Sequence, residues 1–97
     1  MNGSIATVKA YVTPERYYGS HLNGSWGKAT GDGWHHWIGL CPFHNDKRPG
    51  SFVVNRGSGA FKCFSCGENG GDIIDFHMKS RDLGFKDAFK QLQEVSQ

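Results

Sequence analysis

Cys41-Pro42-Phe43-His44 and Cys63-Phe64-Ser65-Cys66 are two short stretches that each place a pair of metal-binding side chains three positions apart. Two residues between a pair of ligands form a tight turn in which both side chains point at one ion. The 18 residues between the stretches can form a β-hairpin that brings the two pairs together. We therefore predict one Zn²⁺ site, closed and tetrahedral, with the ligands Cys41, His44, Cys63 and Cys66.

Two other uses of the cysteines compete with this prediction, namely a redox disulfide and buried free thiols. Neither explains why a histidine, His44, occupies the place of a fourth cysteine. Four protein ligands leave no open position for an activated water, so we expect the zinc to be structural rather than catalytic. The other histidines have no comparable partners and are interpreted as surface or packing residues, namely His21, His35, His36 and His77.

The composition is that of a small domain that needs a stabilising cross-link. The chain has 97 residues, of which 14 are glycine and 37% are hydrophobic, so its apolar core is small. Three cysteines fit poorly with a secreted disulfide framework, and residues 1–12 lack the pattern of a signal peptide. No apolar run approaches the roughly 18 residues that span a bilayer. We expect a cytoplasmic protein without a membrane segment.

Apolar spacing and turn residues predict a small α+β fold, in which helices pack on an antiparallel sheet. Thr13 and Pro14 mark the start of a helix that should end by Gly19. Asp72 and Asp75 are interpreted as helix-start residues rather than as a metal site. The other expected elements are a short helix at 4–11, a hairpin formed by 25–28 and 34–38, a second hairpin formed by 52–54 and 60–64, and two C-terminal helices.

The last helix is the best marked, because Phe85, Ala88, Phe89 and Leu92 follow the spacing of one apolar face. We expect this face to pack on the sheet. Phe43 and Phe64, which lie inside the two ligand pairs, are expected to be local core residues that shield the thiolates.

Further residues around the ligands carry a resemblance to a known family. They are Gly39-Leu40-Cys41-Pro42-Phe43-His44-Asn45-Asp46-Lys47-Arg48-Pro49 with Ser51-Phe52, then Cys63-Phe64-Ser65-Cys66-Gly67, and Gly70-Gly71-Asp72-Ile73-Ile74-Asp75-Phe76. This pattern resembles the CHC2-type zinc-binding domain, a zinc ribbon, of DnaG-type DNA primases. The resemblance assigns 34–97 to that domain, whereas 1–33, a helical segment and the start of the sheet, does not follow the family pattern. Gly50 stands as an insertion between Pro49 and Ser51. We expect one compact domain overall.

The resemblance implies a function in primer synthesis during DNA replication, where the zinc domain recognises single-stranded template DNA and helps initiation. Polymerisation in this family belongs to a separate toprim domain, so the chain alone is expected to have no activity. Its protein partner would be that domain or a helicase. The alternative is a zinc-stabilised interaction domain that docks a replication or mobile-element protein. A stand-alone enzyme would need an open metal site or an activated nucleophile, and the sequence offers neither.

Charge and aromatic residues together suggest where DNA would bind. From Arg16 to Lys62 six basic residues stand against two acidic ones, a balance of +4, whereas the chain from Cys63 onward has a balance of −2. Aromatic rings that stack on bases and cations that pair with phosphates are the usual features of single-strand binders. The expected DNA contacts are Lys28, Trp34, Trp37, Lys47, Arg48, Phe52, Arg56, Phe61 and Lys62.

Two of these aromatics, Phe52 and Phe61, have a core position as a competing interpretation. His35 and His36 are neighbours on an expected strand, so at most one of them faces the DNA.

Overall fold

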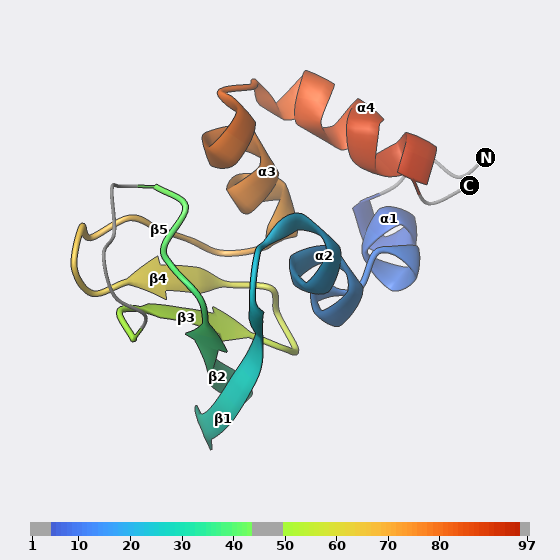
Figure 1. The fold of residues 1–97 in the computed structure, drawn as a ribbon. Helices are drawn as coiled ribbons and strands as arrows, with labels where there is room; N and C mark the ends of the chain where they lie inside the picture. Colours follow the sequence, from blue (N-terminus) through green and yellow to red (C-terminus); the bar gives the residue numbers. More distant parts are fainter. Residues whose placement is uncertain (1–4, 44–49, 96–97) are drawn as a thin grey trace.

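Five antiparallel strands form one sheet, and four helices gather on one side of it, in the computed structural model, which describes residues 5–43 and 50–95 (Figure 1). The strands are hydrogen-bonded in chain order, so each pairs with the next one along the chain. The predicted small α+β fold is confirmed. The elements are α1 (Ile5–Tyr11), α2 (Pro14–His21), β1 (Ser25–Gly31), β2 (Trp34–Ile38), β3 (Phe52–Asn55), β4 (Phe61–Cys63), β5 (Asn69–Gly70), α3 (Ile73–Arg81) and α4 (Phe85–Val95).

The sheet has an inner face, covered by the helices, and an outer face over which none of the helices in the described ranges lies. Side chains alternate between the faces along each strand. The pairing of β2 with β3 and of β3 with β4 aligns His36, Val53 and Lys62 across the outer face. Their neighbours on the same strands, which include Trp37, Phe52 and Phe61, point inward and are buried.

A cluster of phenylalanine rings joins the inner face to α3. The ring of Phe76 on α3 stands edge-on to Phe61 on β4, with their centroids 5.2 Å apart. Phe43 stacks on Phe61 at 5.5 Å and lies 5.3 Å from Phe76, and Phe52 lies within 6.4 Å of both Phe43 and Phe76. Aromatic pairs at such separations stabilise a core beyond the area that they bury. This cluster forms the base on which the cysteine-bearing turns are built.

The chain needs a glycine where β5 passes the Phe61 ring. A Cβ atom on Gly70 would lie 2.5 Å from a ring carbon of Phe61, closer than any real contact. Directly afterwards α3 begins with a reciprocal cap. The Asp72 side chain accepts a hydrogen bond from the N–H of Asp75 at 2.8 Å, and the Asp75 carboxylate accepts one from the N–H of Gly71 at 2.9 Å. Asp72 and Asp75 are thus helix-start residues, as predicted.

The N-terminal helices complete the core rather than lying beside it. Thr13 caps α2 by accepting a hydrogen bond from the N–H of Arg16, as predicted. Tyr17 and Tyr18 on α2 are fully buried, and the Tyr18 hydroxyl donates a hydrogen bond to the carbonyl of Gly59. The prediction that this helix ends by Gly19 is wrong, because α2 continues to His21. Gly19 lies within the helix, because a single glycine costs only about 1 kcal/mol relative to alanine and does not end a helix by itself.

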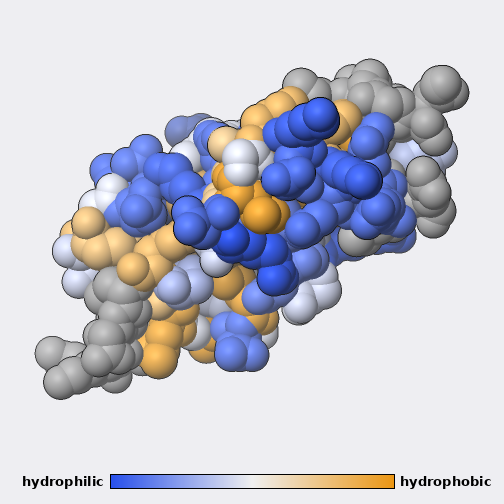
Figure 2. All heavy atoms as spheres, turned by 90° about the horizontal axis from the view of Figure 1, so that it is seen from above, coloured by the Kyte–Doolittle hydropathy of each residue, from blue (hydrophilic) through white to orange (hydrophobic). Residues whose placement is uncertain are grey.

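The last helix does not lie on the sheet. α4 packs against α3 and α1, in a second layer of helices above the first (Figure 1). Phe85 and Phe89 stack on each other at 5.6 Å, and Phe85 is exposed, whereas Ala88 and Leu92 are buried. Seen from this end, the molecule is largely hydrophilic with an apolar patch in the middle (Figure 2). No helix within the described ranges is long and apolar enough to cross a membrane.

Asn55, at the end of β3, ties the two hairpin turns together. Its side-chain oxygen accepts hydrogen bonds from the N–H groups of Gly57 and Ser58, and its side-chain nitrogen donates to the carbonyl of Asp32 at 3.1 Å. Gly33 next to that carbonyl has φ +88°, a conformation that glycine adopts without strain. These bonds fix the turn from which β2, and therefore Trp34, continues.

Candidate metal centre and nucleic-acid interface

Three cysteine sulfurs meet at one point between the sheet and the turn that follows β2. The Sγ atoms of Cys41, Cys63 and Cys66 all lie within 4.8 Å of one another, and those of Cys41 and Cys66 are 4.0 Å apart. Cys63 ends β4 and Cys66 closes the turn after it, while Cys41 follows β2. Three sulfurs converging on one point, rather than two at bonding distance, is the arrangement of a metal site.

Backbone N–H groups point at these sulfurs, as they do in metal-binding turns. The N–H of Phe43 donates to Sγ of Cys41 at 3.4 Å, and the N–H of Cys66 donates to Sγ of Cys63 at 3.5 Å. Burial raises the pKa of Cys41 to about 12. Burial also acts to raise the pKa of Cys63, but the hydrogen bonds outweigh it and bring the pKa down to about 7. The hydrogen bonds to Cys63 thus favour its thiolate, the form that binds a metal.

The sulfur geometry fits a zinc ion. Zinc–sulfur bonds of about 2.3 Å in a tetrahedron place sulfur atoms roughly 3.8 Å apart. The separation of 4.0 Å between Cys41 and Cys66 is close to that value. Among the residues that the structure describes, no other group of histidine, cysteine and acidic side chains converges in this way. His44, the predicted fourth ligand, lies outside the described residues and stays a prediction.

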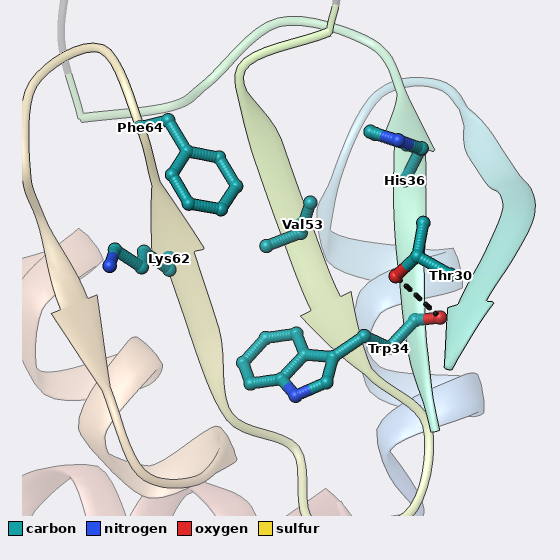
Figure 3. A pocket seen from close by; sticks show the side chains of 6 residues that line it. All are labelled: Thr30, Trp34, His36, Val53, Lys62 and Phe64. Atoms are coloured by element: carbon teal, nitrogen blue, oxygen red, sulfur yellow. Dashed lines mark hydrogen bonds between the residues drawn. The ribbon is translucent and has the colours of Figure 1, made fainter. Parts of the chain in front are cut away.

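A shallow hollow of about 450 Å³ lies on the outer face of the sheet, between β1, β2, β3 and β4 (Figure 3). Val53 forms its floor, and the rings of Trp34 and Phe64 stand at two of its sides (Figure 3). His36, Thr30 and Lys62 complete the lining. None of these six residues is acidic, so the hollow combines two aromatic rings with a cation.

The nine predicted DNA contacts do not share one surface. Trp34 and Lys62 line the hollow together, and Lys28 is exposed on β1. The guanidinium of Arg56 lies over the ring of Trp26, 5.1 Å from its centroid, and Trp26 packs edge-on against Trp37 of the core. Arg56 therefore reaches toward the helix-covered side of the sheet. Lys47 and Arg48 lie outside the described residues.

Three of the predicted contacts belong to the core. Trp37, Phe52 and Phe61 are at most 1% exposed, so no base can stack on their rings in this structure. For Phe52 and Phe61 this is the competing interpretation that the sequence left open. For Trp37 the indole N–H donates to the carbonyl of Asn23 at 2.9 Å, which anchors the ring inward. We take these three residues out of the proposed DNA surface.

Phe64, unlike these three core residues, is exposed on the outer face of the sheet. The expectation that its ring shields the thiolates is therefore wrong. Its side chain is 65% exposed, and the ammonium of Lys62 lies 5.1 Å from its ring centroid. Cys63 and Phe61 point inward, so strand alternation turns Phe64 outward. That alternation was available in the sequence. Phe43, by contrast, packs with the core rings as predicted. Of the two neighbouring histidines, only His36 lines the hollow, while His35 contacts Trp26 on the inner side.

Comparison with known proteins relates this chain to a zinc-finger family and to DNA primases. The family model described as CHC2 zinc finger matches residues 28–97. DNA primases are similar over part of their length. That of Lactococcus lactis is 48% identical over 60 residues, that of Borreliella burgdorferi 50% over 58, and that of Streptomyces coelicolor 52% over 54. These stretches cover 56 to 62% of the chain but only 8 to 11% of each relative. The chain thus spans about a tenth of the length of these curated relatives.

Proposed function

Because the chain belongs to the CHC2 zinc-finger family of DNA primases, we propose that it binds single-stranded DNA as the template-recognition module of a primase. The catalytic step of primer synthesis then belongs to another domain, of the toprim type. That domain or a helicase is the expected protein partner, in the cytoplasm of a bacterium or of a cell that carries a phage or mobile element.

In this proposal one Zn²⁺ is held by Cys41, His44, Cys63 and Cys66 and has a structural role. The ion would neutralise the buried thiolates and tie the turn after β2 to the turn after β4. For a domain with so small a core, the free energy of zinc binding is largely free energy of folding. The convergence of three sulfurs within 4.8 Å supports this part of the proposal.

The observation that carries the DNA-binding proposal is the outer face of the sheet. Exposed aromatic rings beside a cation are the combination on which single-stranded nucleic acids stack and pair their phosphates. The exposed Phe64, the half-buried Trp34 and Lys62 supply that combination on a face over which none of the described helices lies. The acidic groups at the start of α3, by contrast, are engaged in helix capping.

The test is a titration of the zinc-loaded protein with a fluorescently labelled single-stranded oligonucleotide at two salt concentrations. We expect saturable binding that weakens as salt rises, because phosphate contacts release counterions. The same strand annealed to its complement should bind more weakly, because its bases are no longer free to stack. An oligonucleotide that fails to bind even at low salt would refute the proposal.

One feature favours the alternative of a protein-docking domain, namely the exposed Phe85 ring stacked on Phe89 at the far end of the molecule. Aromatic residues are enriched in protein interfaces. The net charge of only +2 also suits such a role. The titration separates the two functions, because a docking domain has no reason to bind an oligonucleotide in a salt-dependent manner.

A further inference from the structure

We propose that the hollow on the outer face of the sheet is a subsite for a single unpaired nucleobase, which is held through its faces and not read through its edges. This inference rests on the proposed single-stranded DNA binding and makes it specific. It assigns Trp34 and Phe64 as the stacking residues and Lys62 as the contact to the adjacent phosphate.

The aromatic walls are placed by the strands on which they lie. Trp34 begins β2, and Phe64 directly follows β4, with its N–H donating to the carbonyl of Ser51 at 2.8 Å. Trp34 is paired with Asn55 and Phe64 lies beside Ser51, so the two rings stand toward opposite ends of β3, with Val53 between them (Figure 3). A planar base lying over Val53 has an aromatic ring on each side. Stacking of this kind tolerates any base, because each base has a π-face.

The ammonium of Lys62 lies where we expect the phosphate next to a stacked base. Lys62 is paired with Val53 across the sheet, and its ammonium is held over the Phe64 ring at 5.1 Å from the centroid. The ring positions the ammonium without neutralising it, in contrast to Lys79, which is 2.8 Å from the carboxylate of Glu68. A phosphate next to the stacked base can therefore pair with Lys62 at little cost in ordering the side chain.

The hollow offers few groups that could distinguish one base from another. Specific reading of a base edge uses paired donors and acceptors, mainly from arginine, lysine, asparagine, glutamine or acidic side chains. Of these only Lys62 lines the hollow, and the proposal assigns it to a phosphate. The Thr30 hydroxyl already donates to the carbonyl of Trp34, at 3.4 Å, which leaves the His36 ring as the main polar group. We therefore expect weak selection among the bases, with purines favoured because their larger rings stack over more area.

The hollow is large enough to hold one base of a flexible strand. Its volume of about 450 Å³ lies within the range of roughly 300 to 1,000 Å³ that is typical of small-molecule sites. The hollow is open to solvent, so the sugar and phosphates on both sides of the base can continue across the surface. A single base can therefore enter from the solvent side while the rest of the strand stays on the surface.

The first experiment measures stacking directly. An oligonucleotide carrying one fluorescent 2-aminopurine is titrated with wild-type protein and with Trp34→Leu, Phe64→Leu and the control Phe85→Leu, which removes an exposed ring on α4. We expect quenching of the 2-aminopurine by the wild type and by the control. Each hollow variant should bind roughly 5- to 150-fold more weakly, the range measured for loss of one base–aromatic contact. Zinc content and circular dichroism check that each variant is folded.

The second experiment uses only the wild-type protein, so it does not depend on the folding of a variant. One abasic site is moved along the oligonucleotide, and affinity is measured at each position. We expect a position at which loss of the base weakens binding roughly 5- to 150-fold, while exchange of that base among all four types changes affinity far less.

The outcomes distinguish this inference from the proposed function. If the oligonucleotide binds but neither the hollow variants nor any abasic site weakens it, the base subsite is refuted and DNA binding stands. A position that accepts only one base type would also refute the subsite as described. If the oligonucleotide does not bind at all, both proposals fall together.

Discussion

The Tyr17 hydroxyl and Nδ1 of His77 lie 2.7 Å apart, so a buried polar pair joins α2 to α3. On the other side of the ring, Nε2 lies 2.7 Å from the side-chain oxygen of Gln91 on α4. That oxygen can only accept, so Nε2 carries the proton and Nδ1 accepts the hydrogen bond from Tyr17. A neutral His77 thus satisfies both neighbours and links three helices.

This arrangement predicts that the protein loses stability as the pH falls below about 6.5, the ordinary pKa of histidine. Burial lowers the pKa of His77, and the charges of Arg81 and His21 lower it further, against a hydrogen bond to Gln91 that raises it. In the acidic range the unfolded chain therefore binds a proton that the folded ring does not, which favours unfolding. The stabilisation is complete above the unfolded pKa and is lost as the pH falls through the folded one.

Urea unfolding of wild type and His77→Gln between pH 7.5 and 5 measures this contribution. We expect the variant to be less stable by about 1 to 3 kcal/mol at pH 7.5, because a buried hydrogen-bonding partner is lost, and the difference to shrink as the pH falls. Titration of the zinc ligands affects both proteins equally. Tyr17→Phe is the matched control, since it removes one hydrogen bond but keeps the titrating ring and hence the pH dependence. A difference that stays constant over this range would contradict the prediction.

The close approach of Gly70 to Phe61 predicts a contrast between two adjacent glycines. Gly70→Ala places a methyl group against the Phe61 ring and should destabilise the fold by about 1 to 3 kcal/mol, the usual cost of overpacking. Gly71→Ala meets no atom closer than 3.7 Å and should change the free energy of unfolding little. Thermal unfolding of the two variants side by side checks this, and equal melting temperatures would show that the ring can move aside.

The metal centre predicts one bound Zn²⁺ per chain, removed by a strong chelator together with most of the secondary structure. Cys63→Ser should abolish zinc binding and folding, because Cys63 is one of the three converging cysteines and is fully buried. His44→Ala should weaken zinc binding, whereas His36→Ala, which removes an exposed histidine on the other face, should not. Metal analysis and circular dichroism measure both effects. Full zinc content in His44→Ala would remove this histidine from the ligand set.

The outer face predicts how cations contribute to DNA binding. Lys62→Ala should lower both the affinity for single-stranded DNA and the salt dependence, with a change in slope of about 0.7 for one lost phosphate contact. Lys86→Ala, on exposed α4, should change neither. Arg56→Ala should also leave the slope intact, because its guanidinium lies over Trp26, toward the helix-covered side of the sheet and away from the hollow. A slope change for Arg56 as large as that for Lys62 would mean that the strand crosses the edge of the sheet instead.

Much of this fold follows from short-range patterns. The caps at Thr13 and Asp72, the turn around Asp32 and the apolar repeats of the helices are local signals, and the structure has all of them. β5 was not predicted, because two residues are too few to show a strand pattern. The prediction that α4 packs on the sheet is wrong, because an amphipathic pattern shows that one face of a helix is buried but does not show which element covers that face.

The candidate site also has a part that local sequence signals predict and a part that depends on the tertiary fold. The cysteine spacing identifies Cys41, Cys63 and Cys66 as metal ligands, because the geometry of a metal-binding turn is local. The DNA surface depends on which face of the sheet each aromatic occupies, and counting rings does not settle that. Starting from buried Cys63 and alternating residues would have placed Phe64 outward and Phe61 inward. For Trp37, only the helices that cover its face determine that it is core.

The buried tyrosines of α2 show that the family match begins later in the chain than the folded unit does. Sequence similarity to the family begins at residue 28, yet Val8, Tyr17 and Tyr18 fill the interior between the sheet and α3. Lys9 reinforces that junction through an ion pair with Asp72, at the first turn of α3. Removing the residues before the family match would therefore remove the side chains that cover Phe76 and Ile73. The stretch that reveals ancestry is shorter than the stretch that must fold together.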